Sequence, residues 1–120
     1  MGALAALAVL TGCGRPEAGD PAYTQVPGAD PQRGRQLAAQ HQCGRCHVIP
    51  DLPAASGRSA PSLAQFGTRS YIAGTIPNGP ATLPRWIESP QALRPGSPMP
   101  DLGVPPAEAR DIAAYLLSLR

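Results

Sequence analysis

The chain has 120 residues, and its ten basic and eight acidic side chains give a formal net charge of +2. All ten basic residues are arginine and none form a basic run, which excludes a typical nucleic-acid binder. Only one Trp, three Tyr and one Phe are available for a core, against 13 Gly and 16 Pro. A single small domain this poor in bulky side chains is expected to need a non-protein group to complete its core.

The first thirteen residues, MGALAALAVLTGC, form a short apolar segment that ends in small residues and Cys13. The segment is too short to span a bilayer, which takes about 20 apolar residues, and it is typical of an export signal. Its end, LTGC, resembles a bacterial lipobox, which implies a lipoprotein signal peptide over residues 1–12 and lipidation of Cys13. The alternative is an ordinary signal peptide with an unmodified Cys13. No Lys or Arg precedes the apolar run, whereas export signals usually begin with one.

Residues 14–29 show neither a helical nor a strand period, so residues 13–29 are expected to form a lipidated N-terminus and a flexible tether. The folded domain is then expected to cover residues 30–120. If Cys13 carries lipid, the domain is anchored on the periplasmic side of a bacterial membrane.

The first predicted helix begins at Pro31, with Asp30 as its N-cap. Positions 34, 37, 38 and 41 recur at helical spacing on one face. Because glycine is costly inside a helix, Gly34 indicates a close approach by another helix.

Three further elements follow in the chain. A short helix is predicted over residues 70–74, and another over 83–88, with Pro84 in its first turn and Pro90 ending it. The clearest helix covers residues 106–119, and its apolar stripe consists of Ile112, Tyr115, Leu116 and Leu119. No strand is predicted. The expected fold is all-α, with three to five helices joined by long loops.

The pentapeptide CGRCH at residues 43–47 is the main functional motif. A thioredoxin-like dithiol would follow a strand in a βαβ unit, and no strand is expected here. A zinc site would need two further ligands, and His41 is the only other histidine. The remaining interpretation is covalent attachment of haem c. Two residues between the cysteines let one turn of chain reach both porphyrin vinyl groups, and the following His47 can then ligate iron.

The second axial ligand of the iron decides between electron transfer and small-molecule binding. Met99 lies between Pro98 and Pro100 in a stiff loop, and it is the only Met after the signal segment. A lone Met is more often a gap-filling core residue, but a proline-rich loop is not an apolar helical face. His41 is the rival ligand, and its closeness to Cys43 argues against it.

Several segments together resemble a class I monohaem cytochrome c. They are GRQLAAQHQCGRCH, APSLAQFG, GTIPNGPATLPRWIESPQ, PGSPMPDLG and EARDIAAYLLSL. The resemblance covers residues 30–120 and extends to the cytochrome c domain fused to subunit II of some bacterial haem-copper oxidases. It implies a small cytochrome c fold wrapped around one covalent haem.

The resemblance also implies roles for individual residues. Cys43 and Cys46 would form the thioether links, and His47 and Met99 would be the axial iron ligands. The Pro61 carbonyl would accept a hydrogen bond from His47 Nδ1. Trp86 would pack on the haem and donate a hydrogen bond to a propionate. Gly34 would let Tyr115 and Leu116 of the last helix pack closely against the first helix. Ala60 and Pro105 depart from the family pattern, which often has Gly before the proline and a Ser or Thr helix cap.

The predicted function is one-electron transfer between respiratory redox proteins, with a haem-copper oxidase as acceptor or an electron-donating complex as source. Neither a small-molecule substrate nor a catalysed reaction is expected. Arg58, Arg69 and Arg94 are candidate docking residues, because related carriers ring the haem edge with positive charge. The alternative is a haem enzyme or gas-binding sensor in which Met99 leaves the iron. The sequence does not distinguish a free shuttle from a fixed subunit of a larger complex.

Overall fold

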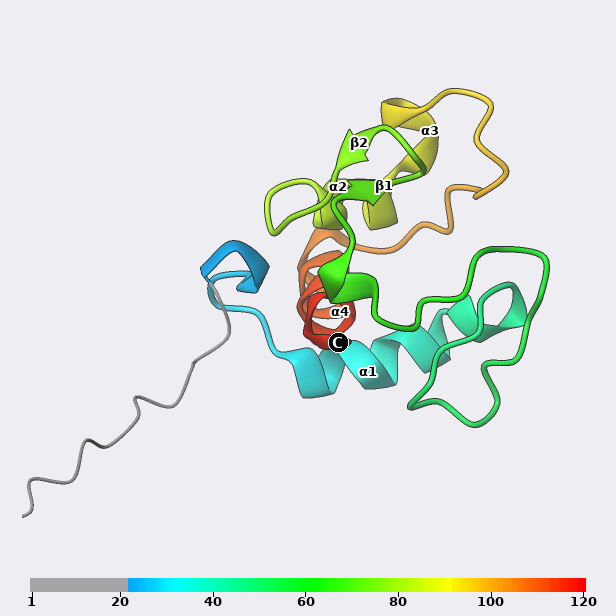
Figure 1. Ribbon diagram of the computed structural model, residues 1–120, viewed down its shortest axis with the longest axis horizontal. Coiled ribbons are helices and arrows are strands. Elements are labelled where there is room, and N and C mark those ends of the chain that lie inside the picture. The colour runs from blue at the N-terminus through cyan, green and yellow to red at the C-terminus, as the bar shows by residue number, and fades with distance from the viewer. Residues whose placement is uncertain (1–21) are drawn as a thin grey trace, which may run out of the picture.

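The computed structural model describes residues 22–120, so the expected signal peptide and Cys13 lie outside the described residues. Four α-helices and a few short elements make up the fold (Figure 1). In chain order the elements are η1 (Ala22–Thr24), α1 (Pro31–Gln40), η2 (Cys43–Arg45), η3 (Phe66–Thr68), β1 (Tyr71–Ile72), β2 (Ile76–Pro77), α2 (Leu83–Glu88), α3 (Pro90–Leu93) and α4 (Pro106–Ser118). The predicted all-α class is confirmed.

Helices α1 and α4 cross and form the centre of the fold (Figure 1). Asp30 caps α1 as predicted, accepting hydrogen bonds from the backbone N–H groups of Gln32 and Arg33. Gly34 faces the other helix, and a Cβ added there would lie 1.9 Å from the Asp111 carbonyl oxygen. The expected close approach is therefore present. It is made by the α4 backbone at residues 111–112, one turn before the expected Tyr115 and Leu116.

The folded part of the chain begins earlier than residue 30. Val26 is buried, and so is Thr24 in η1, which packs against α4. Arg110 of α4 donates to the Pro27 carbonyl. Residues 22–29 therefore belong to the packed body and not to a loose tether.

The helix predicted over residues 70–74 is wrong, because this stretch is one arm and the turn of a β-hairpin. Strands β1 and β2 pair antiparallel, with Ile72 opposite Ile76. Ala73 has φ of 49° and Gly74 has φ of 84°, and both angles turn the chain back where a helix would continue. Strands of only two residues are too short to show an alternating apolar pattern in the sequence, so neither strand was predicted.

Helix α2 covers the predicted residues 83–88, but Pro90 starts α3 instead of only ending α2. Proline is well suited to the first position of a helix, where its missing N–H has no partner to lose. Pro90 is among the most completely buried side chains of the described residues. Helix α3 is therefore a short but firmly seated element.

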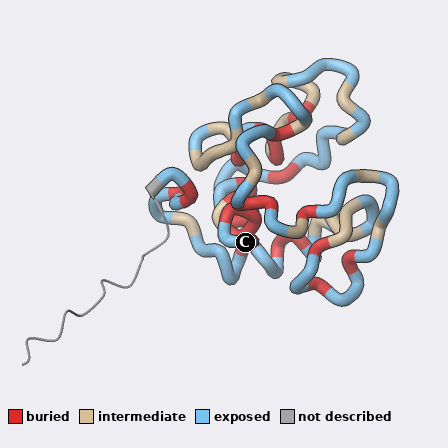
Figure 2. Tube along the Cα trace, viewed as in Figure 1, coloured by how far each residue is buried: buried red, intermediate tan, exposed pale blue. Residues whose placement is uncertain are grey.

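One core cluster connects the parts of the fold, and Figure 2 shows its buried residues along α4 and at the inner sides of the loops. Ile112, Tyr115 and Leu116 of α4 are all buried, as the apolar stripe predicts. Helices α1 and α2 pack on α4 from different directions. Within residues 22–120, no helix combines the length and apolar character needed to cross a bilayer.

Candidate functional site

The CGRCH segment forms a single tight turn directly after α1. Gln42 adopts a left-handed conformation, with φ of 57°, and so redirects the chain into η2. The Cys43 carbonyl then accepts the N–H groups of Cys46 at 3.3 Å and of His47 at 3.0 Å. Cys43 and Cys46 therefore lie one helical turn apart, and neither is in a disulfide. Burial raises the pKa of the Cys43 thiol, whereas Cys46 is exposed.

The long loop after the motif is fastened back onto it by backbone hydrogen bonds. Gly57 N donates to Gly44 O at 3.0 Å, and Ala60 N donates to Cys46 O at 3.1 Å. A Cβ on Gly57 would lie 2.2 Å from the Arg45 carbonyl oxygen. The backbones of the CGRCH turn and the following loop are therefore in direct contact, and at residue 57 only glycine fits.

This loop brings Pro61 to His47. His47 Nδ1 donates to the Pro61 carbonyl oxygen at 2.6 Å. A carbonyl can only accept, so the bond fixes the tautomer with the proton on Nδ1. No residue between 22 and 120 bonds Nε2, which leaves that nitrogen with its lone pair available to a metal ion.

Arg69 supports the Pro61 segment from behind. Its guanidinium donates to the Ser62 and Ala64 carbonyls and lies 5.4 Å from the centre of the Phe66 ring. These bonds hold the backbone of the loop just after Pro61. They do not test the docking role expected for Arg69 from the sequence, which stays a prediction.

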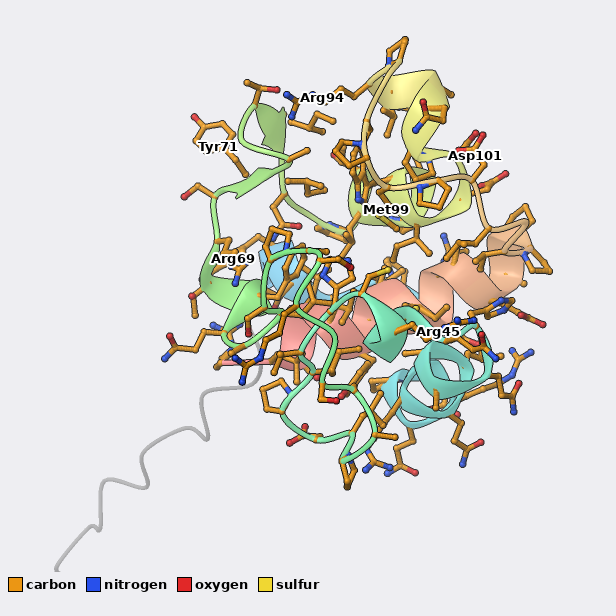
Figure 3. The ribbon with its side chains drawn as sticks, turned by 90° about the vertical axis from the view of Figure 1, so that its right-hand side faces the viewer. Arg45, Arg69, Tyr71, Arg94, Met99 and Asp101 are labelled. Atoms are coloured by element: carbon orange, nitrogen blue, oxygen red, sulfur yellow. The ribbon has the colours of Figure 1, made fainter. Side chains whose placement is uncertain are left out.

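Met99 lies in the loop between α3 and α4 and is partly buried against the core cluster, as is Cys43. In Figure 3 the Met99 side chain lies near the middle of the face, with Arg45 below it and Arg94 and Tyr71 above. No hydrogen bond within residues 22–120 joins Met99 to the CGRCH turn. Met99 therefore comes from a different loop than His47, and it packs against the same core cluster as Cys43.

Trp86 of α2 is 7% exposed and packs in the same core. Its burial agrees with a role as plain core, and the expected contacts with a cofactor remain a prediction. Shortly before α2 in the chain, residues 75–78 include β2 and end at Asn78. The Asn78 side-chain amide donates to the Phe66 and Arg69 carbonyls and so ties this segment to η3. In Figure 1, α2 and the hairpin lie above α4, whereas α1 lies below it.

Comparison with known proteins connects this geometry to a family. The cytochrome c family profile matches residues 31–120. The chain belongs to the cytochrome c family. Its members carry covalently bound haem c, so haem c is the cofactor of this cytochrome and electron transfer its general function.

The relatives of this cytochrome include subunits of respiratory oxidases. Cytochrome c oxidase subunit 2 of Alkalihalophilus pseudofirmus is 36% identical over 91 residues, which are 73% of this chain and 25% of the relative. Cytochrome c oxidase subunit 2 of Bacillus subtilis is 31% identical over 70 residues, which are 57% of this chain and 20% of the relative. The chain therefore spans a quarter or less of the length of these relatives. These matches confirm the resemblance seen in the sequence.

The donor set fits haem c. Two free thiols stand one turn apart, an imidazole has its Nδ1 occupied and its Nε2 available, and a thioether lies in a separate, partly buried loop. Haem c supplies an iron that takes up and releases one electron. The chain's own part is to orient the imidazole, through Pro61, and to keep the site packed against the core.

Two features of the site were missed from the sequence. One is the close backbone contact at Gly57, since a glycine in a Ser- and Ala-rich loop carries no pattern of its own. The other is the set of side chains that holds the Met99 loop, Gln91 and Asp101, because their partners are backbone groups several residues away.

Proposed function

We propose that this cytochrome moves single electrons through a haem held by Cys43 and Cys46, with His47 and Met99 as the two axial ligands. The observation that carries the proposal is the 2.6 Å hydrogen bond from His47 Nδ1 to Pro61 O. This bond fixes the orientation of the imidazole ring and leaves the lone pair of Nε2 without a partner among the described residues. A thioether as second ligand would fill the sixth coordination position of the iron, which leaves no position for a small molecule, and would raise the reduction potential.

The test is an optical spectrum of the holoprotein, produced in cells that attach haem c. Oxidised protein is expected to be low-spin and to show the weak red absorption band of a thioether bound to ferric iron. Met99→Leu keeps the volume but removes the ligand, so the band should disappear and the reduced form should bind CO. Leu102→Ala is the matched control, because Leu102 lies in the same loop and is 45% exposed. High-spin wild-type protein that binds CO readily would instead indicate a sensor or a haem enzyme.

We further propose that the electron acceptor is a haem-copper oxidase and that lipid on Cys13 holds the carrier at the membrane. The similarity to subunit 2 of two oxidases supports the acceptor, and the LTGC segment supports the anchor. Under this proposal the carrier itself catalyses no reaction. Globomycin-sensitive processing of the precursor and loss of membrane association in Cys13→Ser would test the anchor.

The face around Met99 suits a negatively charged partner. Arg45 and Arg94 are exposed on this face, and Tyr71 is 57% exposed near Arg94 (Figure 3). Asp101 is also on this face, but its carboxylate accepts hydrogen bonds from Gln91 N and the Ser89 hydroxyl. Tyr and Arg are typical of protein interfaces. Arg45→Gln should slow electron delivery to the oxidase and flatten its dependence on ionic strength. Arg110→Gln removes the same charge beside Pro27, away from this face, and should leave the rate unchanged.

A further inference from the structure

The loop that carries Met99 has little structure of its own. Residues 94–105 contain no helix or strand, and four of them are proline. Within the loop, Ser97 N donates to Arg94 O and Met99 N donates to Ser97 Oγ. In the described structure, the hydrogen bonds that connect residues 96–104 to the chain outside the loop all go to Gln91 or Ser89. The position of Met99 therefore depends on very few contacts.

Gln91 makes three of these contacts with one side chain. Its amide nitrogen Nε2 donates to the Ser97 carbonyl at 2.8 Å and to the Met99 carbonyl at 2.7 Å. Its amide oxygen Oε1 accepts the Gly96 N–H at 3.0 Å. Both ends of the amide are thus used, and together they gather the loop from residue 96 to residue 99 around one side chain.

Gln91 is itself firmly placed. The preceding Pro90 is completely buried, and Leu93 packs against the core cluster. Arg94, just after α3, donates to the Ala73 carbonyl in the hairpin turn. The far side of the loop is tied to the same residue, because Asp101 Oδ1 accepts the backbone N–H of Gln91 at 3.1 Å. The loop is therefore anchored, on both sides of Met99, to a rigid base.

We infer that Gln91 is a positioning residue that holds Met99 at the iron and keeps other ligands off it. The inference rests on the proposed function, in which Met99 is an axial ligand. A methionine side chain is flexible, so its occupancy of the iron depends on where the backbone at residue 99 is held. Without the Gln91 amide, the loop should spend more time with the thioether off the iron. An external ligand can bind only in that state, and its apparent affinity scales with the population of that state.

The experiment measures imidazole binding to the ferric holoprotein of Gln91→Leu and Gln91→Glu. Leu removes all three hydrogen bonds of the side chain. Glu keeps an oxygen that can accept from the Gly96 N–H, but its second, negatively charged oxygen would face the Ser97 and Met99 carbonyls. Imidazole is expected to bind about tenfold more tightly to both variants, which corresponds to about 1.4 kcal/mol. The red absorption band of the thioether–iron bond should weaken in parallel. Gln36→Leu and Gln36→Glu are the matched controls, because Gln36 is exposed on α1 and has no side-chain hydrogen bond in the described structure.

The outcomes separate the inference from the proposed function. Wild-type protein without the band, or Met99→Leu with unchanged imidazole affinity, would remove Met99 as a ligand and the inference with it. A normal wild-type band with unchanged imidazole affinity in both Gln91 variants would overturn the inference alone. A lower Tm with unchanged imidazole affinity well below that Tm would assign Gln91 a merely structural role and would also overturn it.

Discussion

Replacing Gly34 by alanine tests the contact on which the fold depends most. The new Cβ would lie 1.9 Å from the Asp111 carbonyl oxygen and 2.9 Å from Ile112 N. Because both are backbone atoms of α4, no side-chain rotation can relieve the overlap. Widening the gap from 1.9 Å to an ordinary contact of about 3.4 Å requires the helices to separate by about 1.5 Å.

The cost of this separation can be worked from the contacts it affects. Overpacking of a tight interface costs about 1–3 kcal/mol. The buried Asp111 carboxylate accepts from Asp30 N at 2.8 Å and from Arg33 at 2.6 Å across the same helix pair. Stretching these bonds adds roughly 1–3 kcal/mol, while the better helix propensity of alanine returns about 1 kcal/mol. The net destabilisation is expected near ~3 kcal/mol, which lowers Tm by roughly 10–25 °C in a domain of this size.

Thermal unfolding of the holoprotein measures the effect, and Gly79→Ala is the control. A Cβ at Gly79 meets no atom within 4 Å, and Gly79 does not have a positive φ. That variant should be neutral or slightly stabilised, because alanine restricts the unfolded chain. A Gly34→Ala protein that melts within about 3 °C of the Gly79→Ala protein, a difference below ~1 kcal/mol, would refute the tight α1–α4 contact.

Three other substitutions follow from the same structure. Gly57→Ala would place a Cβ 2.2 Å from the Arg45 carbonyl oxygen. This overlap should lower Tm by several degrees. It should also reduce the yield of haem-loaded protein, measured by the pyridine haemochrome assay. Tyr115→Phe should keep or raise Tm, because the buried Tyr115 hydroxyl has no hydrogen-bond partner within the described structure; a clear loss of stability would show an unseen partner. Asp111→Leu leaves the N–H of Asp30 and the Arg33 guanidinium without their acceptor. Because Arg33 is half-exposed and water can solvate it, urea unfolding should show a loss of about 1–3 kcal/mol, and a loss below ~0.5 kcal/mol would contradict this account.

The elements that were predicted from sequence are those whose signals are local. Asp30 followed by Pro31 defines the start of α1, and the apolar stripe of α4 gives that helix to within one residue of its end. The CGRCH motif gives the cofactor because its spacing reflects the chemistry of attachment. Local signals of this kind do not depend on how the rest of the chain folds.

The features that were missed depend on long-range contacts. The hairpin at residues 71–77 has strands of two residues, too short for an alternating pattern, and it forms because Ala73 and Gly74 turn the chain. Val26 is buried in the core cluster and the neighbouring η1 packs against α4, so the place of this segment in the folded part depends on contacts with residues far away in the sequence. In the sequence Gln91 is not distinguished from other polar residues, and its importance comes from three backbone groups that lie five to eight residues later, at Gly96, Ser97 and Met99.

The contribution of haem to folding can be tested by removing its points of attachment. Helix α1 has 10 residues and α4 has 13, and helices shorter than about 12–15 residues are marginal in water without packing. The loops on either side of the candidate site, residues 46–65 and 94–105, contain no helix and only an isolated bridge between Val48 and Ser56. We therefore expect the chain with Cys43→Ser and Cys46→Ser to lose most of its helical circular dichroism, since the free energy of binding the group is part of the free energy of folding.

The wild-type chain made in cells without the haem-attachment machinery is the matched control for this double variant. It keeps both thiols and lacks only the haem, so it should show the same loss of helix. If both proteins instead keep a native helical spectrum and a cooperative melting transition, the packing of α1, α2 and α4 is sufficient for folding. The haem would then be held by a fold that exists before it, and the low content of bulky residues would not indicate a missing part of the core.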